Sequence, residues 1–243
     1  REQYGAGALR FAEAVNAAVL RISDAYRNGN DVIGISTGLR DLDARMGGLS
    51  EGELVVLAGR PSMGKTALAT NIAVDAAMRG ITVDFYSLEM TAEQMATRII
   101  ADRVHIGSDK LRRGQISEEE FHRTIAAAKA IQGVSLFIDE TGGLSIAQLA
   151  ARARRTKRQH GTGLIVVDYL QLLNGSRRDG RVNEVTEITT GLKALAKELN
   201  VVVIALSQLS RNAANKARPQ LSDLRDSGAI EQDADIVIFV HRD

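Results

Sequence analysis

The most constraining feature of this sequence is a glycine-rich loop between an apolar run and a run of helix formers. The loop, Gly59-Arg60-Pro61-Ser62-Met63-Gly64-Lys65-Thr66, fits the pattern G-x-x-x-x-G-K-[ST]. Residues 53–58 before it indicate a buried strand, and residues 66–78 after it indicate a helix. In such a unit the loop N–H groups and the positive end of the helix dipole converge on an anion. The sequence therefore predicts a nucleoside triphosphate site, with Lys65 reaching the β- and γ-phosphates and the Thr66 hydroxyl on Mg²⁺.

Length and composition limit the alternatives. The 243 residues suit one large α/β domain with a sizeable core. The 31 basic and 30 acidic residues nearly cancel, so any site for a polyanion must be local. Without Cys and with four scattered His, neither a disulfide framework nor a structural zinc site is expected. No apolar run approaches the roughly 20 residues of a membrane span and no signal peptide is recognisable, so we expect a soluble, intracellular protein without a membrane partner.

Strands and helices alternate after the loop. Three helices between the strands begin with capping boxes, at Thr91, Ser117 and Ser145. Apolar strands separated by helices favour an α/β fold, with a mostly parallel, twisted sheet covered by helices on both faces. The candidate strands are residues 81–87, 134–138, 164–167, 201–206 and 236–240.

In such a sheet the ligand binds at the carboxyl ends of the strands. This rule places the glycine-rich loop, Glu89, Asp139, Asp168 and Gln208 along one edge, where we expect them to form one site. Asp139 and Asp168 both follow an apolar run, so the strand pattern does not decide which of them serves the metal. Glu89 is either a base for the attacking water or a carboxylate near a helix N-terminus, and Gln208 is either a γ-phosphate sensor or a polar turn residue.

The N-terminal segment and two basic clusters each allow two interpretations. An amphipathic helix at residues 8–27 has an apolar stripe, which packs either on its own domain or on a neighbouring subunit. The basic cluster within residues 152–158 is either a solvated helix face or a nucleic-acid contact. The same choice applies to Arg177, Arg178 and Arg181, which follow the Asp168 strand. With few aromatic residues, contact with DNA through phosphates is more credible than base stacking.

Five motifs in series resemble those of the DnaB-type bacterial replicative DNA helicases, which carry a RecA-like ATPase domain. The resemblance extends from about residue 8 to the end of the chain. The motifs are the glycine-rich loop, Ser87-Leu88-Glu89-Met90, residues 167–172 (Val-Asp-Tyr-Leu-Gln-Leu), residues 205–211 (Ala-Leu-Ser-Gln-Leu-Ser-Arg) and residues 218–235, from Arg218-Pro219 to Ala234-Asp235.

The resemblance implies a role for each candidate residue. By this resemblance, Asp168 is the Walker B carboxylate that serves Mg²⁺. Glu89 is the general base, and Gln208 is the sensor of the γ-phosphate. Arg98 becomes a further γ-phosphate contact in the ATP site. Single-stranded DNA is expected at Arg225, Asp226 and Gly228. The family commonly has Glu where Asp226 stands and Ser where Ala229 stands, which makes Asp226 the less secure DNA contact.

The resemblance also implies an activity and an organisation. We expect an ATP-dependent helicase that moves 5′ to 3′ on single-stranded DNA as a homohexamer, in the bacterial cytoplasm at the nucleoid and replisome. Residues 1–31 would be a linker helix docking on the neighbouring subunit, and residues 32–243 a RecA-like P-loop motor domain that is incomplete at its C-terminus. Primase and a helicase loader would bind outside this chain. The alternatives are a RecA-like recombination or repair ATPase that forms filaments on DNA, and a nucleotide-switched scaffold.

Overall fold

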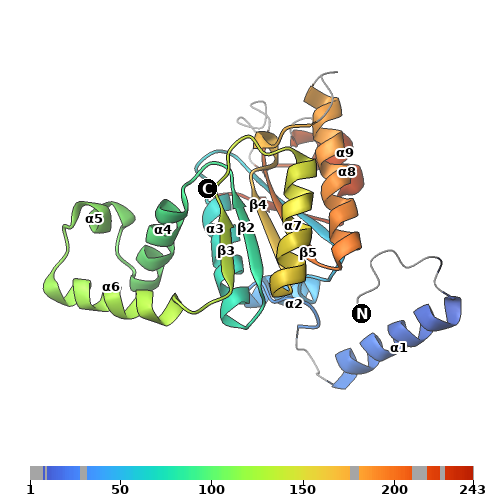
Figure 1. Cartoon of the computed structure of the whole chain (residues 1–243), viewed down its shortest axis with the longest axis horizontal. Helices are drawn as coiled ribbons and strands as arrows, with labels where there is room; N and C mark the ends of the chain where they lie inside the picture. The colour runs from blue at the N-terminus through green and yellow to red at the C-terminus, as the bar shows by residue number, and fades with distance from the viewer. Residues whose placement is uncertain are drawn as a thin grey trace.

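The protein is built around a parallel sheet. The computed structural model describes residues 8, 10–27, 32–175, 181–209, 218–224 and 228–242. Its six-stranded sheet has the order β3-β2-β4-β5-β1-β6, and each pair of neighbours is parallel (Figure 1). All the predicted strands are confirmed, with no end shifted by more than two residues. The strands are β1 (Leu54–Gly59), β2 (Val83–Ser87), β3 (Leu136–Asp139), β4 (Leu164–Asp168), β5 (Val202–Gln208) and β6 (Ile236–Val240).

The helices follow the signals in the sequence. The hydroxyls of Thr91, Ser117 and Ser145 each accept a hydrogen bond from the third helical N–H, so the three predicted capping boxes are confirmed. The helices of the described residues are α1 (Phe11–Arg27), α2 (Arg40–Met46), α3 (Lys65–Met78), α4 (Ala92–Val104), α5 (Ser108–Arg113), α6 (Glu118–Ile131), α7 (Ile146–His160), α8 (Arg181–Leu199) and α9 (Gly228–Asp233), with single 3₁₀ turns at η1 (Leu170–Leu172) and η3 (Leu221–Asp223).

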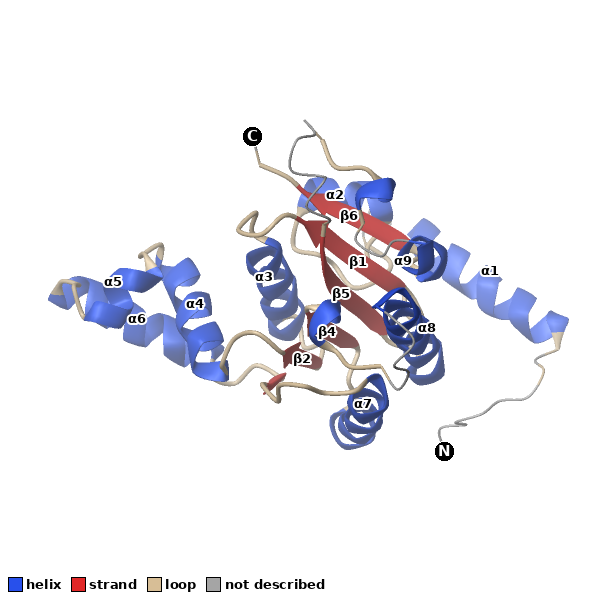
Figure 2. Cartoon of the chain, turned by 90° about the horizontal axis from the view of Figure 1, so that it is seen from above, coloured by secondary structure: helices blue, strands red, loops and turns tan. Residues whose placement is uncertain are grey.

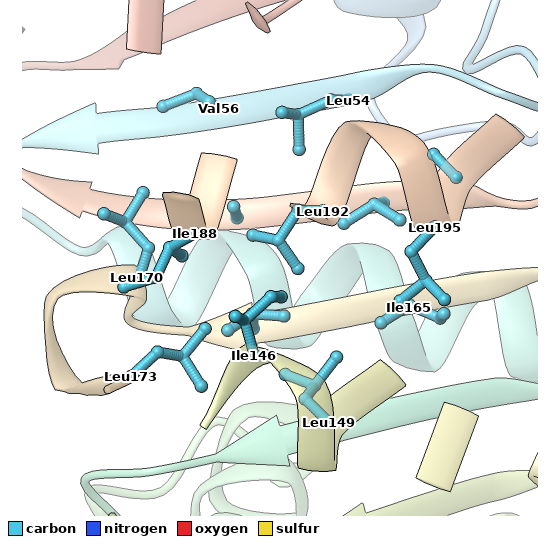
Figure 3. Close-up of a cluster of buried hydrophobic side chains, with 14 of the residues drawn as sticks. Leu54, Val56, Ile146, Leu149, Ile165, Leu170, Leu173, Ile188, Leu192 and Leu195 are labelled. Carbon is cyan, nitrogen blue, oxygen red and sulfur yellow. The ribbon is translucent and has the colours of Figure 1, made fainter. Parts of the chain in front are cut away.

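Helices cover both faces of the sheet, as predicted. Successive residues of a strand point to opposite faces, so Leu54 and Val56 of β1 face α7 and α8, whereas Val55 and Leu57 face α3. Figure 2 shows α3 on one side of the sheet and α7 and α8 on the other. The apolar side chains of the α7–α8 layer interlock with those of β1 and β4 (Figure 3). The central strands are completely buried, which explains their continuous apolar sequences.

Two parts of the chain extend from this core. Helices α4, α5 and α6 lie together beyond the β3 side of the sheet (Figure 1). Helix α1 lies apart from the sheet, with Phe11 85% and Tyr26 89% exposed. Its amphipathic pattern is therefore present, but its stripe is exposed in this single chain, which does not support packing on its own domain.

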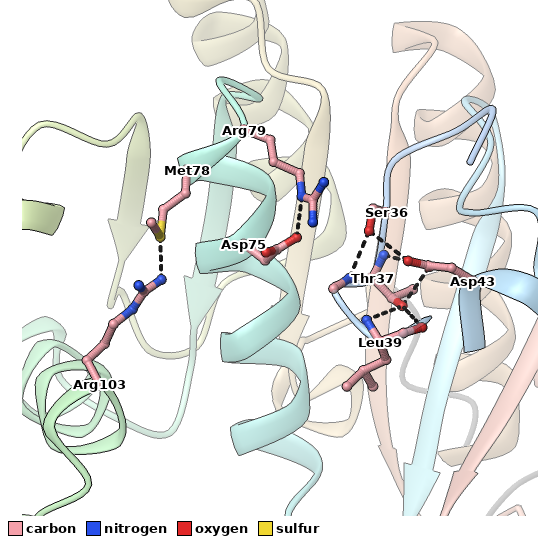
Figure 4. Close-up of polar contacts among 9 residues, drawn as sticks. Ser36, Thr37, Leu39, Asp43, Asp75, Met78, Arg79 and Arg103 are labelled. Carbon is pink, nitrogen blue, oxygen red and sulfur yellow. Dashed lines mark hydrogen bonds and ion pairs between the residues drawn. The ribbon is translucent and has the colours of Figure 1, made fainter. Parts of the chain in front are cut away.

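The segment between α1 and β1 is fixed by a buried carboxylate. Asp43 of α2 accepts hydrogen bonds from the Ser36 hydroxyl at 2.7 Å, the Thr37 N–H at 2.8 Å and the Thr37 hydroxyl at 2.7 Å (Figure 4). Ile35 and Leu49 form an isolated antiparallel bridge beside it. These contacts join residues 35–49 to one another, and the segment packs on the sheet through the buried Leu49 and the partly buried Ile35 and Met46.

Candidate active site

The glycine-rich loop has the geometry of an anion site. It joins the end of β1 to the start of α3, and Gly64 before the helix has a φ of 94°, in the left-handed region that glycine tolerates. Among the described residues no side chain caps α3, so its first N–H groups remain available to an anion. At Gly59 a Cβ atom would lie 2.8 Å from the Val240 carbonyl oxygen, which explains the glycine at this close approach.

Lys65 is held inside the loop that it is expected to serve. Its Nζ donates to the Arg60 carbonyl oxygen at 2.9 Å, and the residue is 8% exposed. Burial lowers the pKa of Lys65, while the carboxylates of Asp168 and Glu89 oppose that shift. The charges of Asp168 and Glu89 therefore act on Lys65 from the same edge of the sheet.

Asp168 is the buried carboxylate of the site. It ends β4, is 2% exposed, and forms a side-chain hydrogen bond with Thr66. Burial raises the pKa of Asp168, and the Glu89 charge raises it further. The Thr66 hydrogen bond and the Lys65 and Arg98 charges act in the opposite direction. The structure thus brings together Lys65, Thr66, Glu89, Asp168 and Arg98 from the loop, β4, α4 and the turn after β2.

These residues fit a magnesium ion. Mg²⁺ prefers hard oxygen ligands and keeps several waters, so one hydroxyl and one carboxylate beside a triphosphate suffice. Thr66 and Asp168 provide that pair. A cation beside Asp168 would also offset the free-energy cost of burying its negative charge. Within the described part of the chain, no group of three or more His, Cys, Asp or Glu side chains is arranged to hold a metal ion. Thr66 and Asp168 are thus the two groups that could hold a metal ion together with phosphate oxygens.

Glu89 lies exposed in the turn after β2. The preceding residue, Leu88, donates its N–H to the Asp168 carbonyl oxygen at 2.9 Å, which ties this turn to the end of β4. Gln208 ends β5 and lies opposite Gly59 in the β1–β5 register. Gln171 joins the β4 turn to the end of β5 and is the residue that the sequence argument missed as a site component. Its only sequence signal is its position in the segment after Asp168.

Asp139 lies at the carboxyl edge of the sheet, but it is not among the groups that act on Lys65 or Asp168. It ends β3 at the edge of the sheet, and Arg152 of α7 donates to it at 2.5 Å. The pKa of Asp139 is lowered: burial acts to raise it, but hydrogen bonds from Thr141 and Arg152 outweigh burial. Asp139 stabilises the contact between β3 and α7, which agrees with the choice of Asp168 for the metal.

The basic cluster of α7 is largely engaged in contacts within the domain. Arg154 binds Glu198 of α8 with two hydrogen bonds of 2.7 and 2.8 Å, and Arg152 binds Asp139. Lys157 Nζ donates to the Thr162 carbonyl oxygen at 2.9 Å. These pairs favour a structural, solvated helix face over a nucleic-acid contact.

Several predicted contacts fall outside the described residues. Arg177 and Arg178 lie there, and so do the predicted DNA contacts Arg225 and Asp226. Arg181 begins α8, but its side chain is not described. The third DNA contact, Gly228, is the exposed first residue of α9. In the part of the chain that the structure describes, no helix combines the length and the apolar character needed to cross a membrane.

Comparison with known proteins finds relatives that are described as replicative DNA helicases or their domains. The family model described as the DnaB-like helicase C terminal domain matches residues 34–243. The chain is 49% identical over 248 residues to the replicative DNA helicase DnaB of Rickettsia bellii, covering 96% of this chain and 50% of that protein. It is 43% identical to the replicative DNA helicase DnaC of Bacillus subtilis, covering 91% of this chain and 50% of that protein. The chain thus spans about half the length of the curated relatives it matches.

Solved structures agree with the fold. One structure, titled as an ATPase domain, superposes with a TM-score of 0.91 at 34% identity, covering 97% of this chain and 84% of that one. A second, titled as a DnaB-like replicative helicase and its interactions with primase, has a TM-score of 0.87 at 35% identity, covering 98% of this chain and 57% of that one. The predicted RecA-like α/β fold is confirmed.

Proposed function

Because this chain belongs to the DnaB-like helicase C-terminal domain family, we propose that it is the motor domain of a replicative DNA helicase. ATP hydrolysis would drive 5′ to 3′ movement on single-stranded DNA and unwinding of duplex at the replication fork. The observation that carries this proposal is the convergence of Lys65, Thr66, Glu89 and Asp168 at the carboxyl edge of the sheet.

Each residue of the cluster has a role in phosphoryl transfer to water. The residues of the glycine-rich loop, 59–66, cradle the phosphates with their N–H groups, and Lys65 adds a positive charge at the β- and γ-phosphates. Glu89 aligns the attacking water and accepts its proton. Arg98 contacts the γ-phosphate, and its charge already acts on Asp168. Gln208 contacts the same phosphate from the end of β5.

Mg²⁺ is the cofactor that fits this site. The Thr66 hydroxyl would bind the ion directly, and Asp168 would bind its water shell. When bound, the ion neutralises charge on the β- and γ-phosphates. Burial raises the pKa of Asp168, and the Thr66 hydrogen bond and the Lys65 charge act against that shift and favour the charged carboxylate.

The DNA contacts proposed for this chain are Arg225, Asp226 and Gly228, which lie between β5 and β6. Gly228 opens α9, and residues at a helix start can offer N–H groups to a backbone phosphate. Contacts of this kind do not depend on base sequence, which suits a motor that travels along any DNA, and they weaken with salt.

We propose that residues 1–31 form a linker and residues 32–243 the motor, and that six copies assemble into a ring. The apolar stripe of α1, formed by Phe11, Val15, Val19, Ile22 and Tyr26, is exposed and would be buried on the neighbouring subunit. The surface that would receive it lies at α4–α6, which line an open groove of about 1150 Å³ that includes the half-exposed Phe121. Primase and a helicase loader would bind the assembled protein, which would act in the cytoplasm at the replisome.

Unwinding of forked DNA by the intact protein tests this function. Forks with only a 5′ tail should be unwound in the presence of ATP and Mg²⁺, whereas forks with only a 3′ tail should not. Lys65→Met should abolish unwinding, because the charge at the β- and γ-phosphates is lost. ATP hydrolysis without unwinding of either fork would refute the helicase function and favour a filament-forming RecA relative.

A further inference from the structure

The side chain of Gln171 connects the turn after β4 with the end of β5. Its Nε2 donates to the Ser207 hydroxyl at 3.0 Å, and its Oε1 accepts from the Gln208 backbone N–H at 3.3 Å. A backbone N–H can only donate, so the amide oxygen must face it, and this fixes the orientation of the Gln171 amide. Ser207 is completely buried, so one of the two contacts lies in the interior of the domain.

This connection replaces a hydrogen bond that the sheet cannot make. The β4–β5 ladder extends only to Val167 and Ala205, because β4 ends at Asp168. On the other side of β5, the N–H of Leu209 donates to the Gly59 carbonyl oxygen of β1 at 3.3 Å. Since successive strand N–H groups alternate between the two neighbours, the N–H of Gln208 faces the β4 side. Gln171 supplies the acceptor there, which a backbone N–H in a protein interior requires.

The residues on either side of this connection carry the proposed chemistry. The Asp168 carbonyl oxygen, three residues before Gln171, accepts the Leu88 N–H beside Glu89. Leu209, one residue after Gln208, forms an isolated antiparallel bridge with Leu224. Leu224 is buried and directly precedes Arg225, the first proposed DNA contact. A continuous set of bonds therefore joins the metal carboxylate and the sensor to the start of the DNA-binding segment.

Resting on the function proposed above, we propose that Gln171 is a positioning residue that couples ATP binding to single-stranded DNA binding. It makes the turn after Asp168 and the end of β5 move as one unit. A shift of Asp168 or Gln208 on nucleotide binding is then passed through Leu209 to Leu224. Coupling of two sites needs such an element, whose position both ligands bias.

The test measures the affinity of the intact protein for single-stranded DNA, with and without a non-hydrolysable ATP analogue plus Mg²⁺. The ratio of the two affinities reports the coupling. Gln171→Met keeps the length of the side chain but removes both hydrogen bonds. We expect this substitution to reduce the ratio by roughly tenfold, which corresponds to the free energy of about one hydrogen bond. Gln132→Met, at an exposed glutamine that follows α6, is the matched control and should keep the wild-type ratio.

Two further variants make the result specific. Gln171→Glu keeps one oxygen for the Gln208 N–H and another that accepts from the Ser207 hydroxyl. It should therefore retain most of the wild-type ratio of DNA affinities. Ser207→Ala removes the hydroxyl partner of Gln171 and should reduce the ratio of DNA affinities by a smaller factor. If Gln171→Met does not fold, Ser207→Ala provides the test of the coupling. A purely structural role would weaken both DNA affinities equally and leave the ratio unchanged, as would the absence of any role, so an unchanged ratio overturns the proposal. Failure of the wild-type protein to bind DNA in either state would instead refute the proposed function, and this role with it.

Discussion

Replacement of Asp43 should loosen the segment of residues 35–49, which lies between α1 and β1. Asp43 is 7% exposed and accepts hydrogen bonds from Ser36 and Thr37, of which Thr37 is itself 2% exposed. A hydrogen bond to a charged group contributes about 1.5–3 kcal/mol, but three bonds to one carboxylate are not additive, and burying that carboxylate has its own cost. We therefore expect Asp43→Ala to lower the free energy of unfolding by about 3–4 kcal/mol. Asp43→Asn, which keeps the shape and an acceptor oxygen, should lower it by about 1–2 kcal/mol.

Urea unfolding monitored by circular dichroism measures both values, and Asp41→Ala provides the control. Asp41 lies on the same helix, but its side chain is 97% exposed and its ion pair with Arg40 spans 3.8 Å, so its removal should change stability by less than about 0.5 kcal/mol. A stability of Asp43→Ala equal to that of Asp41→Ala would refute the reasoning. It would mean that water satisfies the Ser36 and Thr37 donors as well as the carboxylate does.

The same carboxylate predicts a pH dependence. The pKa of Asp43 is lowered from 3.8: burial acts to raise it, but hydrogen bonds from Ser36 and Thr37 outweigh burial. A lowered folded-state pKa means that the stabilisation is fully present above pH 3.8 and is lost as the pH falls through the lower, folded value. The stability difference between the wild-type protein and Asp43→Asn should thus stay constant from neutral pH to about pH 5 and shrink below about pH 4. A difference that instead shrinks between pH 8 and 6 would assign the effect to another group.

Three further predictions concern the active site and the DNA contacts. Glu89→Gln should still bind ATP but lose hydrolysis by several orders of magnitude, because an amide cannot accept the proton of the attacking water; undiminished single-turnover hydrolysis would contradict the assignment. Gly59→Ala should destabilise the protein by about 1–3 kcal/mol in urea unfolding, because its Cβ would lie 2.8 Å from the Val240 carbonyl oxygen and 3.2 Å from Lys65. Arg225→Ala should weaken single-stranded DNA binding at every sequence and reduce the salt slope by roughly one, while DNA-free ATP hydrolysis persists; unchanged affinity would place the contact elsewhere.

The sheet and the phosphate loop were predictable because local and global signals agree. Apolar runs bounded by glycines and capping residues define where strands and helices begin. Once the strands are parallel, their carboxyl ends must share one edge, and this brings Asp168 to Lys65 without any knowledge of side-chain contacts. The same argument places Asp139 at that edge, but the strand pattern does not reveal that β3 is the outermost strand, where Asp139 pairs with Arg152.

The position of α1 could not be derived from its pattern. A stripe of apolar residues at helical spacing predicts that one face will be buried, but it does not name the surface that buries it. In this chain Phe11, Val19 and Tyr26 remain more than half exposed, so the residues described here do not supply the surface that buries the stripe.

Gln171 shows why a role for a polar residue beside an active site escapes sequence patterns. Its importance arises from the length of its neighbour: β4 ends at Asp168, whereas β5 continues to Gln208, so the last N–H of β5 has no strand beside it. Strand β5 extends a few residues beyond the end of β4, and its last N–H therefore needs an acceptor from elsewhere. Only the register of the two strands, which are far apart in the sequence, reveals this. The functional candidates that a P-loop motif predicts are those that contact the nucleotide. Residues that join those contacts to another ligand are found by asking which acceptor satisfies each N–H at the end of the sheet.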